Sequence, residues 1–125
     1  MKVVAKPVAG EYKIDSGLAE LEVEPGSPNS WLLKINGMQS SHIDLADPLR
    51  LDFEYMRWMV SLIEDRWGTD QRLRALHLGG GACSVARYLV AKYLESRNAV
   101  VEIDGQLAVY VREWFGLPKA PLLKI

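Results

Sequence analysis

The chain has 125 residues, of which 49% are hydrophobic, and this length and composition are enough for one domain with an ordinary core. Its formal net charge of -1 provides no excess of positive charge to neutralise a phosphate backbone, so we expect no nucleic-acid partner. The single cysteine, Cys83, excludes an internal disulfide, and no apolar run is long enough to span a bilayer, so we expect a cytoplasmic protein without a membrane partner.

The first third of the chain shows a period of two, which is typical of half-buried strands. Apolar and acidic residues alternate over 18–24, and a second apolar run follows at 31–35. After this run, Asn36 and Gly37 favour a type I′ hairpin turn because both residues tolerate a positive φ. These features predict a small antiparallel β meander, which we assign to residues 1–45.

The period then changes to three and four, which predicts an amphipathic helix over residues 48–67. Asp47 is placed to cap this helix by accepting a backbone N–H, Pro48 suits its first turn, and Gly68 suits its end. We expect the apolar face of the helix to pack on the rest of the protein. That face consists of Leu51, Tyr55, Trp58, Met59, Leu62, Ile63 and Trp67.

The remainder of the chain alternates between strand and helix patterns. We predict short buried strands at 75–78 and 99–103, helices at 84–93 and 106–115, and the opening of a third strand at 122–125. Such alternation implies parallel strands joined by right-handed crossovers. The predicted fold class is therefore α/β, with the β meander followed by a truncated Rossmann-like parallel sheet over residues 46–125.

A glycine turn joins the first of these strands to its helix. Gly79, Gly80 and Gly81 follow that strand, and Glu102 stands at the end of the next one. Glycines at this turn let the backbone come close to a nucleoside, and a carboxylate on the next strand can accept the hydroxyl protons of a ribose. Glycine turns are also common packing devices, so the spacing to Glu102 is what favours a nucleoside site.

Four other residues of chemical interest have simpler interpretations. Asp104 is placed to cap the following helix, and Cys83 has no neighbour in sequence that would make it a nucleophile, so we expect it to be a packing residue. His77 lies in a predicted buried strand and is expected to be a hydrogen-bonded core histidine. His42 has no ligand neighbour, so we expect no metal site.

Three stretches of the sequence carry a resemblance to a known family. Residues 35–39 (INGMQ) are similar to its hydrophobic-Asp-Gly-x-x-Gln strand end, and residues 53–55 (FEY) are similar to its Phe-x-Tyr. Residues 78–81 (LGGG), followed by 101–104 (VEID), are similar to its Gly-Gly-Gly-Asp and Val-Glu-Ile-Asp. In this order the stretches resemble the spermidine synthases, aminopropyltransferases that share the fold of class I S-adenosylmethionine methyltransferases.

The resemblance implies transfer of an aminopropyl group from decarboxylated S-adenosylmethionine, as co-substrate, to a diamine such as putrescine. It implies small-molecule partners, a nucleoside and a polyamine, and no prosthetic group. The nucleoside would lie on the glycine turn, with Glu102 holding the ribose and Ile103 lying against adenine. Tyr55 and, more approximately, Gln39 correspond to residues of the polyamine pocket.

The sequence also departs from the family pattern. Ala82 stands where the family has an aspartate that grips the aminopropyl ammonium, and Cys83 and Ser84 replace two glycines. Met56 and Arg57 stand where the family usually has His or Gln followed by Glu. The family's catalytic aspartates lie on a further strand, so we expect this chain alone to be inactive.

Three functions follow as alternatives. In the first, the chain is a portion of an aminopropyltransferase. In the second, it is a methyltransferase-like protein that uses intact S-adenosylmethionine, as Ala82 would permit. In the third, it is a non-catalytic relative that binds a nucleoside or a protein. The strand at 75–78 should lie at the centre of its sheet, yet the pattern leaves one of its edges unpaired. We therefore expect either a fragment of a longer gene product or a homodimer that covers this edge.

Overall fold

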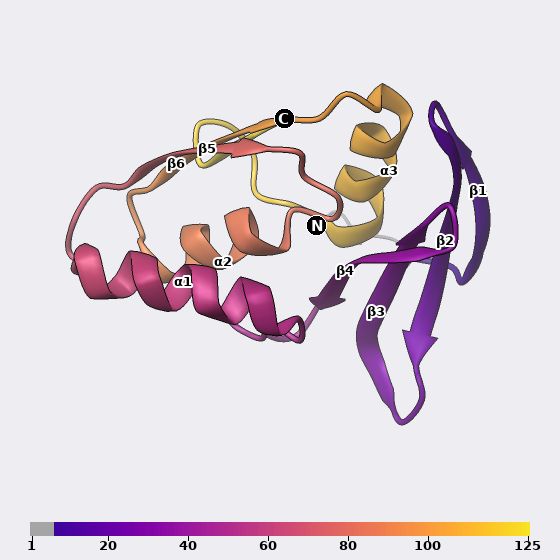
Figure 1. Ribbon diagram of the computed structural model, residues 1–125, viewed down its shortest axis with the longest axis horizontal. Helices are drawn as coiled ribbons and strands as arrows, with labels where there is room; N and C mark the ends of the chain where they lie inside the picture. Colours follow the sequence, from indigo (N-terminus) through magenta and orange to yellow (C-terminus); the bar gives the residue numbers. More distant parts are fainter. Residues whose placement is uncertain (1–6) are drawn as a thin grey trace, which may run out of the picture.

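The computed structural model describes residues 7–125, which form two sheets and three helices (Figure 1). The first sheet contains β1 (Gly10–Ile14), β2 (Gly17–Glu24), β3 (Ser27–Ile35) and β4 (Met38–Asp44). The second contains β5 (Arg74–Leu78), β6 (Arg97–Val101) and β7 (Leu123–Lys124). The helices are α1 (Glu54–Arg66), α2 (Ser84–Lys92) and α3 (Gly105–Phe115), and within the described residues no helix has the length and apolar character needed to cross a membrane.

The first sheet is the predicted antiparallel meander, with neighbouring strands in the order β1-β2-β3-β4. The expected hairpin turn is confirmed, because Asn36 and Gly37 have φ values of 51° and 79° and the flanking Ile35 and Met38 pair across the turn. The Asn36 side chain also accepts a hydrogen bond from the backbone N–H of Leu18 at 2.9 Å. This turn residue therefore ties the start of β2 to the end of β3.

The second sheet is parallel, in the order β5-β6-β7, which confirms the α/β fold class. Helices α1 and α2 pack together beneath this sheet (Figure 1). The prediction that residues 75–78 are a buried strand is wrong for one face, because Leu76 is 67% and Leu78 82% exposed. Within the described residues β5 has a strand neighbour on one side only, and no helix covers the face that carries these leucines.

One hydrophobic cluster joins the meander to the parallel sheet. It includes Leu21, Trp31, Leu33, Ile43, Ala82, Val100, Leu107, Val111, Phe115 and Leu123. Aromatic rings extend the cluster between β1 and α3, where Tyr12 meets Trp114 edge to face at 4.9 Å and Tyr110 stacks on Trp114 at 4.9 Å. Burial of these groups holds the two sheets in a fixed relation to one another.

The predicted start of the long helix is wrong. Helix α1 begins at Glu54 rather than at Pro48, and the Asp47 carboxylate accepts the N–H of Leu49 in a local turn instead of capping a helix. Between this turn and α1, the Arg50 guanidinium forms ion pairs with carboxylates of the meander. These tertiary contacts hold the segment before α1 in a non-helical conformation and outweigh the local capping signal.

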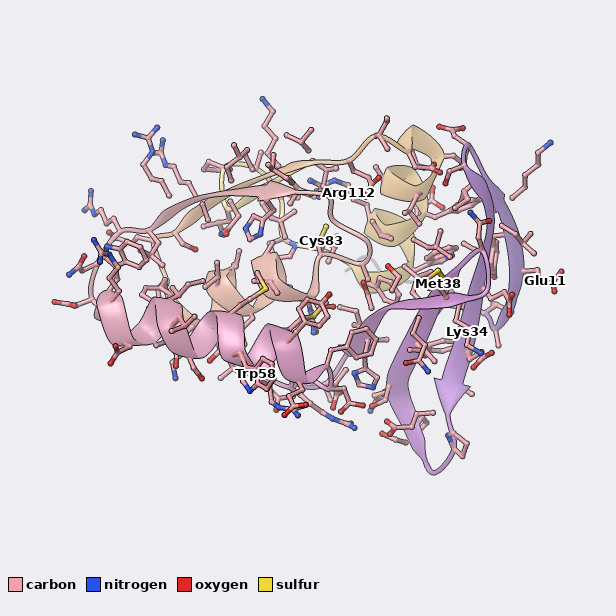
Figure 2. All side chains as sticks on the ribbon, viewed as in Figure 1. Glu11, Lys34, Met38, Trp58, Cys83 and Arg112 are labelled. Atoms are coloured by element: carbon pink, nitrogen blue, oxygen red, sulfur yellow. The ribbon has the colours of Figure 1, made fainter. Side chains whose placement is uncertain are left out.

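The predicted packing face of α1 is also wrong. The buried residues of the helix are Met56 and Val60, at 8% and 5% exposure. Trp58 is 61% exposed (Figure 2), and Leu62 is 72% exposed. The helix carries two adjacent apolar stripes, and either one satisfies the helical period. Packing against Tyr88 of α2 selects the stripe of Met56 and Val60, and the larger apolar side chains face outward.

Asp104 links the meander to α3. Its side chain is 3% exposed and caps the helix, as predicted, by accepting the N–H of Leu107 at 2.9 Å. It also accepts hydrogen bonds from the N–H and hydroxyl of Ser16, at 2.8 and 2.7 Å, and from the N–H of Asp15 at 3.2 Å. Burial acts to raise the pKa of this carboxyl, but the hydrogen bonds outweigh it and lower the pKa to about 2.

The Asp104→Asn substitution should lower the free energy of unfolding at pH 7 by about 1 to 3 kcal/mol, because the amide cannot accept the same charge-assisted bonds. Since the folded pKa is depressed, the stabilisation is complete above the ordinary value of 3.8 and is lost as pH falls through about 2. Urea denaturation from pH 7 to pH 2 measures this loss, with Asp65→Asn as an exposed control. If the difference in free energy of unfolding between wild type and Asp104→Asn stays constant across this pH range, the lowered pKa of Asp104 is contradicted.

Candidate functional site

A cavity of about 460 Å³ opens at the carboxyl ends of β5 and β6. Open α/β sheets bind their ligands at this end of the strands. The meander, α1 and the turn after β5 all contribute to its walls. Residues that line it include Ser40, Ser41, Tyr55, Met59, His77, Gly79, Gly80, Gly81, Cys83 and Glu102.

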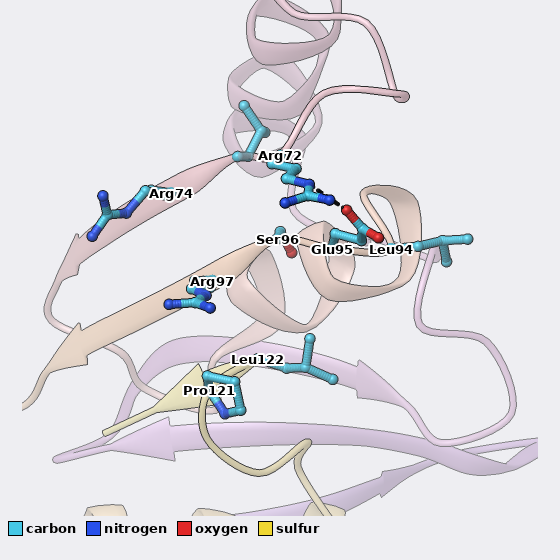
Figure 3. Close-up of a pocket in the computed structure, with 9 residues that line it drawn as sticks. Arg72, Arg74, Leu94, Glu95, Ser96, Arg97, Pro121 and Leu122 are labelled. Carbon is cyan, nitrogen blue, oxygen red and sulfur yellow. Dashed lines mark ion pairs between the residues drawn. The ribbon is translucent and has the colours of Figure 1, made fainter.

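A second hollow, of about 520 Å³, lies near the amino ends of the same strands (Figure 3). It is lined by Arg72, Arg74 and Arg97, and Arg72 forms an ion pair with Glu95 at 2.5 Å. This hollow is of similar size, but it lies at the opposite end of the strands from the glycine turn. We therefore take the cavity at the carboxyl ends as the candidate site.

The glycine turn has a backbone that other residues would not tolerate. Gly79 and Gly81 have φ values of 81° and 54°. A Cβ atom added to Gly80 would lie 2.7 Å from a methyl group of Val100, and one added to Gly81 would lie 2.6 Å from the Ser41 hydroxyl oxygen. The turn is therefore pressed against both β6 and the meander, and its open side faces the cavity.

The carboxylate of Glu102 faces this turn. Its Oε1 accepts hydrogen bonds from the N–H groups of Gly80 and Gly81, at 3.1 and 3.3 Å, and its Oε2 accepts the N–H of Asp104 at 3.0 Å. The structure thus brings together the glycine turn and the acidic residue that the sequence pattern pairs with it. The carboxylate is half-buried and lines the cavity.

The other predicted site residues lie at different places. Tyr55 is 52% exposed and lines the same cavity as the glycine turn. Ile103 is 98% exposed and is not among the residues that line that cavity. Gln39 lines a separate cavity of about 220 Å³, so the structure does not bring Gln39 and Tyr55 into one pocket.

Several lining residues were not predicted from the sequence to belong to the site. Ser41 accepts the backbone N–H of Ala82 at 3.0 Å, and Met59 contributes an apolar side chain from α1. His77, expected to be a hydrogen-bonded core histidine, does have a polar partner, with its Nε2 atom 3.0 Å from the Oδ1 atom of Asn98, but it is half-buried and lines the cavity. The position of Ser41, two residues after Gln39, could have indicated that it belongs to the site. The place of Met59 in the cavity wall could not be predicted, because it depends on which stripe of α1 packs inward.

The two residues after the glycine turn are both buried. Ala82 is fully buried, so a side chain at this position is enclosed by the hydrophobic cluster. Cys83 is 3% exposed, and burial raises the pKa of its thiol to about 11. A thiol with this pKa is protonated at neutral pH, in agreement with the predicted packing role.

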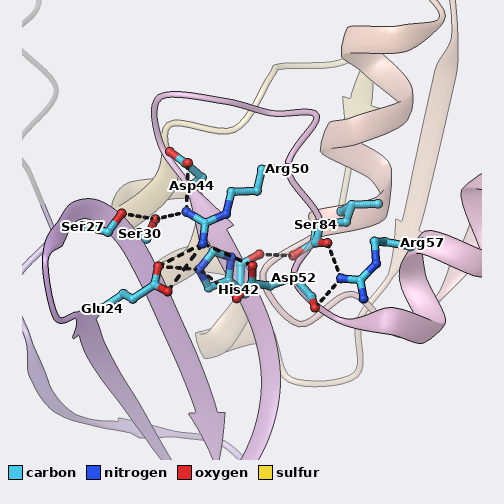
Figure 4. Close-up of polar contacts among 10 residues, drawn as sticks. Glu24, Ser27, Ser30, His42, Asp44, Arg50, Asp52, Arg57 and Ser84 are labelled. Carbon is cyan, nitrogen blue, oxygen red and sulfur yellow. Dashed lines mark hydrogen bonds and ion pairs between the residues drawn. The ribbon is translucent and has the colours of Figure 1, made fainter.

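The expectation that His42 has no ligand neighbours is wrong. The Nε2 atom of His42 lies 3.5 Å from Oε2 of Glu24 and 3.7 Å from Oδ2 of Asp52 (Figure 4). Glu24 comes from β2 and Asp52 from the segment before α1. The sequence could not show this cluster because all three residues are far apart along the chain.

No family model matches the sequence, and no curated protein matches it. The structure is similar to the crystal structure of a probable spermidine synthase from Corynebacterium glutamicum ATCC 13032, with a TM-score of 0.88 and 46% sequence identity. The match covers 96% of this chain and 44% of that one, so the chain spans less than half the length of this relative. On this sequence and fold similarity, the chain is spermidine synthase-like over the part that it shares with this relative.

Proposed function

We propose that the chain supplies the nucleoside-binding part of an aminopropyltransferase of the spermidine synthase type. The observation that carries this proposal is the Glu102 carboxylate facing the N–H groups of Gly80 and Gly81 at the mouth of a 460 Å³ cavity. In this proposal, residues 46–125 hold the adenosine part of decarboxylated S-adenosylmethionine. The N-terminal domain that we assign to residues 1–45, of which the structure describes the part from residue 7, would form one wall of the site.

The ribose would compete with the backbone for the Glu102 carboxylate. In the ligand-free protein Oε1 accepts two backbone N–H groups and Oε2 accepts one, so one lone pair, on Oε2, is free for a ribose hydroxyl. A second hydroxyl would have to displace a glycine N–H from Oε1. The glycine turn provides close approach to the ligand, and Tyr55 would line the side where the amine binds. We keep Gln39 and Ile103 as proposed contacts of the polyamine and of adenine, which requires that the ligand extend beyond the cavity.

The reaction in this proposal is a substitution at carbon. The nitrogen of the diamine attacks the aminopropyl carbon next to sulfur, the carbon–sulfur bond breaks, methylthioadenosine leaves, and the amine loses a proton. The sulfonium is already an activated leaving group, so correct placement of donor and acceptor supplies most of the rate enhancement. The contribution of this chain is therefore the orientation of the nucleoside.

A second candidate is a methyltransferase-like protein that binds intact S-adenosylmethionine. It is favoured by Ala82, which leaves no carboxylate at the position where the family grips the aminopropyl ammonium. Ala82 is also fully buried, so the loss of charge there is accommodated by packing rather than by another ligand-facing group. A third candidate is a non-catalytic relative that binds a nucleoside or a protein.

Isothermal titration calorimetry with three compounds separates these candidates. An aminopropyltransferase portion should bind methylthioadenosine more tightly than S-adenosylhomocysteine, because its site is built for a donor without the carboxylate. A methyltransferase-like protein should show the opposite order, and putrescine is added to test the amine pocket beside Tyr55. If none of the three compounds binds, both enzyme proposals are contradicted and a partner-binding role is favoured.

The Glu102→Gln substitution should weaken methylthioadenosine binding by about 1 to 3 kcal/mol, because it removes a charged acceptor from the ribose hydroxyls. Glu113→Gln, on the exposed side of α3, is the matched control and should bind as the wild type does. Urea denaturation of both variants separates a loss of binding from a loss of folding. Equal affinities for Glu102→Gln and wild type would remove Glu102 from the site.

We also propose a homodimer in which the free edge of β5 pairs with a second copy, covering Leu76 and Leu78. Sedimentation velocity should then show a concentration-dependent dimer, which Leu78→Glu should convert to a monomer. Val109→Glu, at a valine on α3 that is 51% exposed, should leave the dimer intact. A wild-type monomer at every concentration would contradict the proposal.

A further inference from the structure

The side chain of His42 is buried. It lies on β4, is 5% exposed, and neither ring nitrogen has a hydrogen-bond partner within the described part of the chain. Burying an unpaired polar nitrogen destabilises a protein, and buried polar groups normally have partners. The unpaired Nε2 atom faces the carboxylates of Glu24 and Asp52, but neither carboxylate forms a hydrogen bond with it.

The distances in this cluster suit a shared ion better than direct hydrogen bonds. Nε2 of His42 lies 3.5 Å from Oε2 of Glu24 and 3.7 Å from Oδ2 of Asp52, which is long for a hydrogen bond. One ligand atom from each of the three residues can be chosen so that all lie within 4.8 Å of one another. Tetrahedral zinc, with bonds of about 2.0 to 2.2 Å, separates its ligand atoms by about 3.3 to 3.6 Å.

The two carboxylates are held in place by arginines from the segment before α1 and from α1 itself. The Arg50 guanidinium contacts Glu24 Oε2 and Asp52 Oδ1, each at 3.2 Å, which leaves Oδ2 of Asp52 free (Figure 4). Arg57 donates to the backbone oxygen atoms of Leu51 and Asp52, at 2.9 and 2.6 Å. The ligand atoms are therefore positioned before any ion binds, which lowers the entropic cost of binding.

The charge of the cluster also favours a divalent cation. Arg50 contacts three carboxylates, those of Glu24, Asp44 and Asp52. The three carboxylates outnumber the Arg50 and Arg57 guanidinium groups beside them, so the cluster keeps a net negative charge next to a cavity of about 220 Å³. A divalent cation would be attracted to this charge and would also give the buried Nε2 atom its missing partner.

We propose that Glu24, His42 and Asp52 form a binding site for a divalent transition-metal ion, with Zn²⁺ as the best fit to one imidazole and two carboxylates. Three protein ligands leave a coordination position for water. The ion would connect β2 and β4 to the segment that leads into α1. It would thus fix the start of the helix that carries Tyr55, without any contact with the glycine turn.

The test is Zn²⁺ binding by the 125-residue chain after dialysis against EDTA, measured by isothermal titration calorimetry. The proposal predicts one ion per chain. Asp52→Asn, at an exposed side chain, and Glu24→Gln should each lower the affinity at least about tenfold. Glu20→Gln is the matched control, because Glu20 lies on the same strand as Glu24 but outside the cluster, and it should bind as the wild type does.

A second readout identifies the histidine. Co²⁺ added to the metal-free protein should give a visible absorption band of a tetrahedral or five-coordinate site, and this band should be lost in His42→Gln. Circular dichroism of each variant shows that it is folded. Absence of Zn²⁺ binding by the folded wild type would overturn the proposal, and so would equal binding by wild type, Asp52→Asn and Glu24→Gln. Neither of these metal-binding results bears on methylthioadenosine binding, so the metal site and the nucleoside site are tested separately.

Discussion

A single carboxylate, that of Glu102, joins three elements of the parallel half of the molecule. It stands at the end of β6 and accepts N–H groups from the turn after β5 and from Asp104 at the start of α3. Bonds of backbone N–H groups to an ionised oxygen are stronger than those between neutral groups. The group that shapes the turn is therefore also the one that we propose a nucleoside engages, so in this proposal folding and ligand binding use one set of contacts.

The meander contributes to the site because it is fixed against the glycine turn. The hydroxyl of Ser41 accepts the N–H of Ala82, and the hydroxyl of Ser84 donates to the backbone oxygen of His42 at 2.9 Å. Both bonds are buried and connect β4 to the start of α2. Together with the shared hydrophobic cluster and the Asp104 bonds, they make the wall of the cavity part of a rigid unit.

Features set by neighbouring residues were predictable from the sequence, and features set by distant packing were not. The turn at Asn36 and Gly37 and the cap at Asp104 follow from local backbone preferences. The meeting of acid and glycine turn follows from parallel topology, because adjacent parallel strands end at the same edge. The outward position of Trp58 and the partners of His42 depend on long-range contacts that no local pattern contains.

In the proposed complex an adenosine-type ligand lies between the glycine turn and Glu102. Nuclear magnetic resonance of the ¹⁵N-labelled chain during addition of methylthioadenosine would detect a ligand at this position. We expect saturable shifts of the amide signals of Gly80, Gly81 and Asp104, because these N–H groups share the carboxylate with the incoming ribose. Unchanged signals at these three positions, with or without shifts elsewhere, would contradict the account.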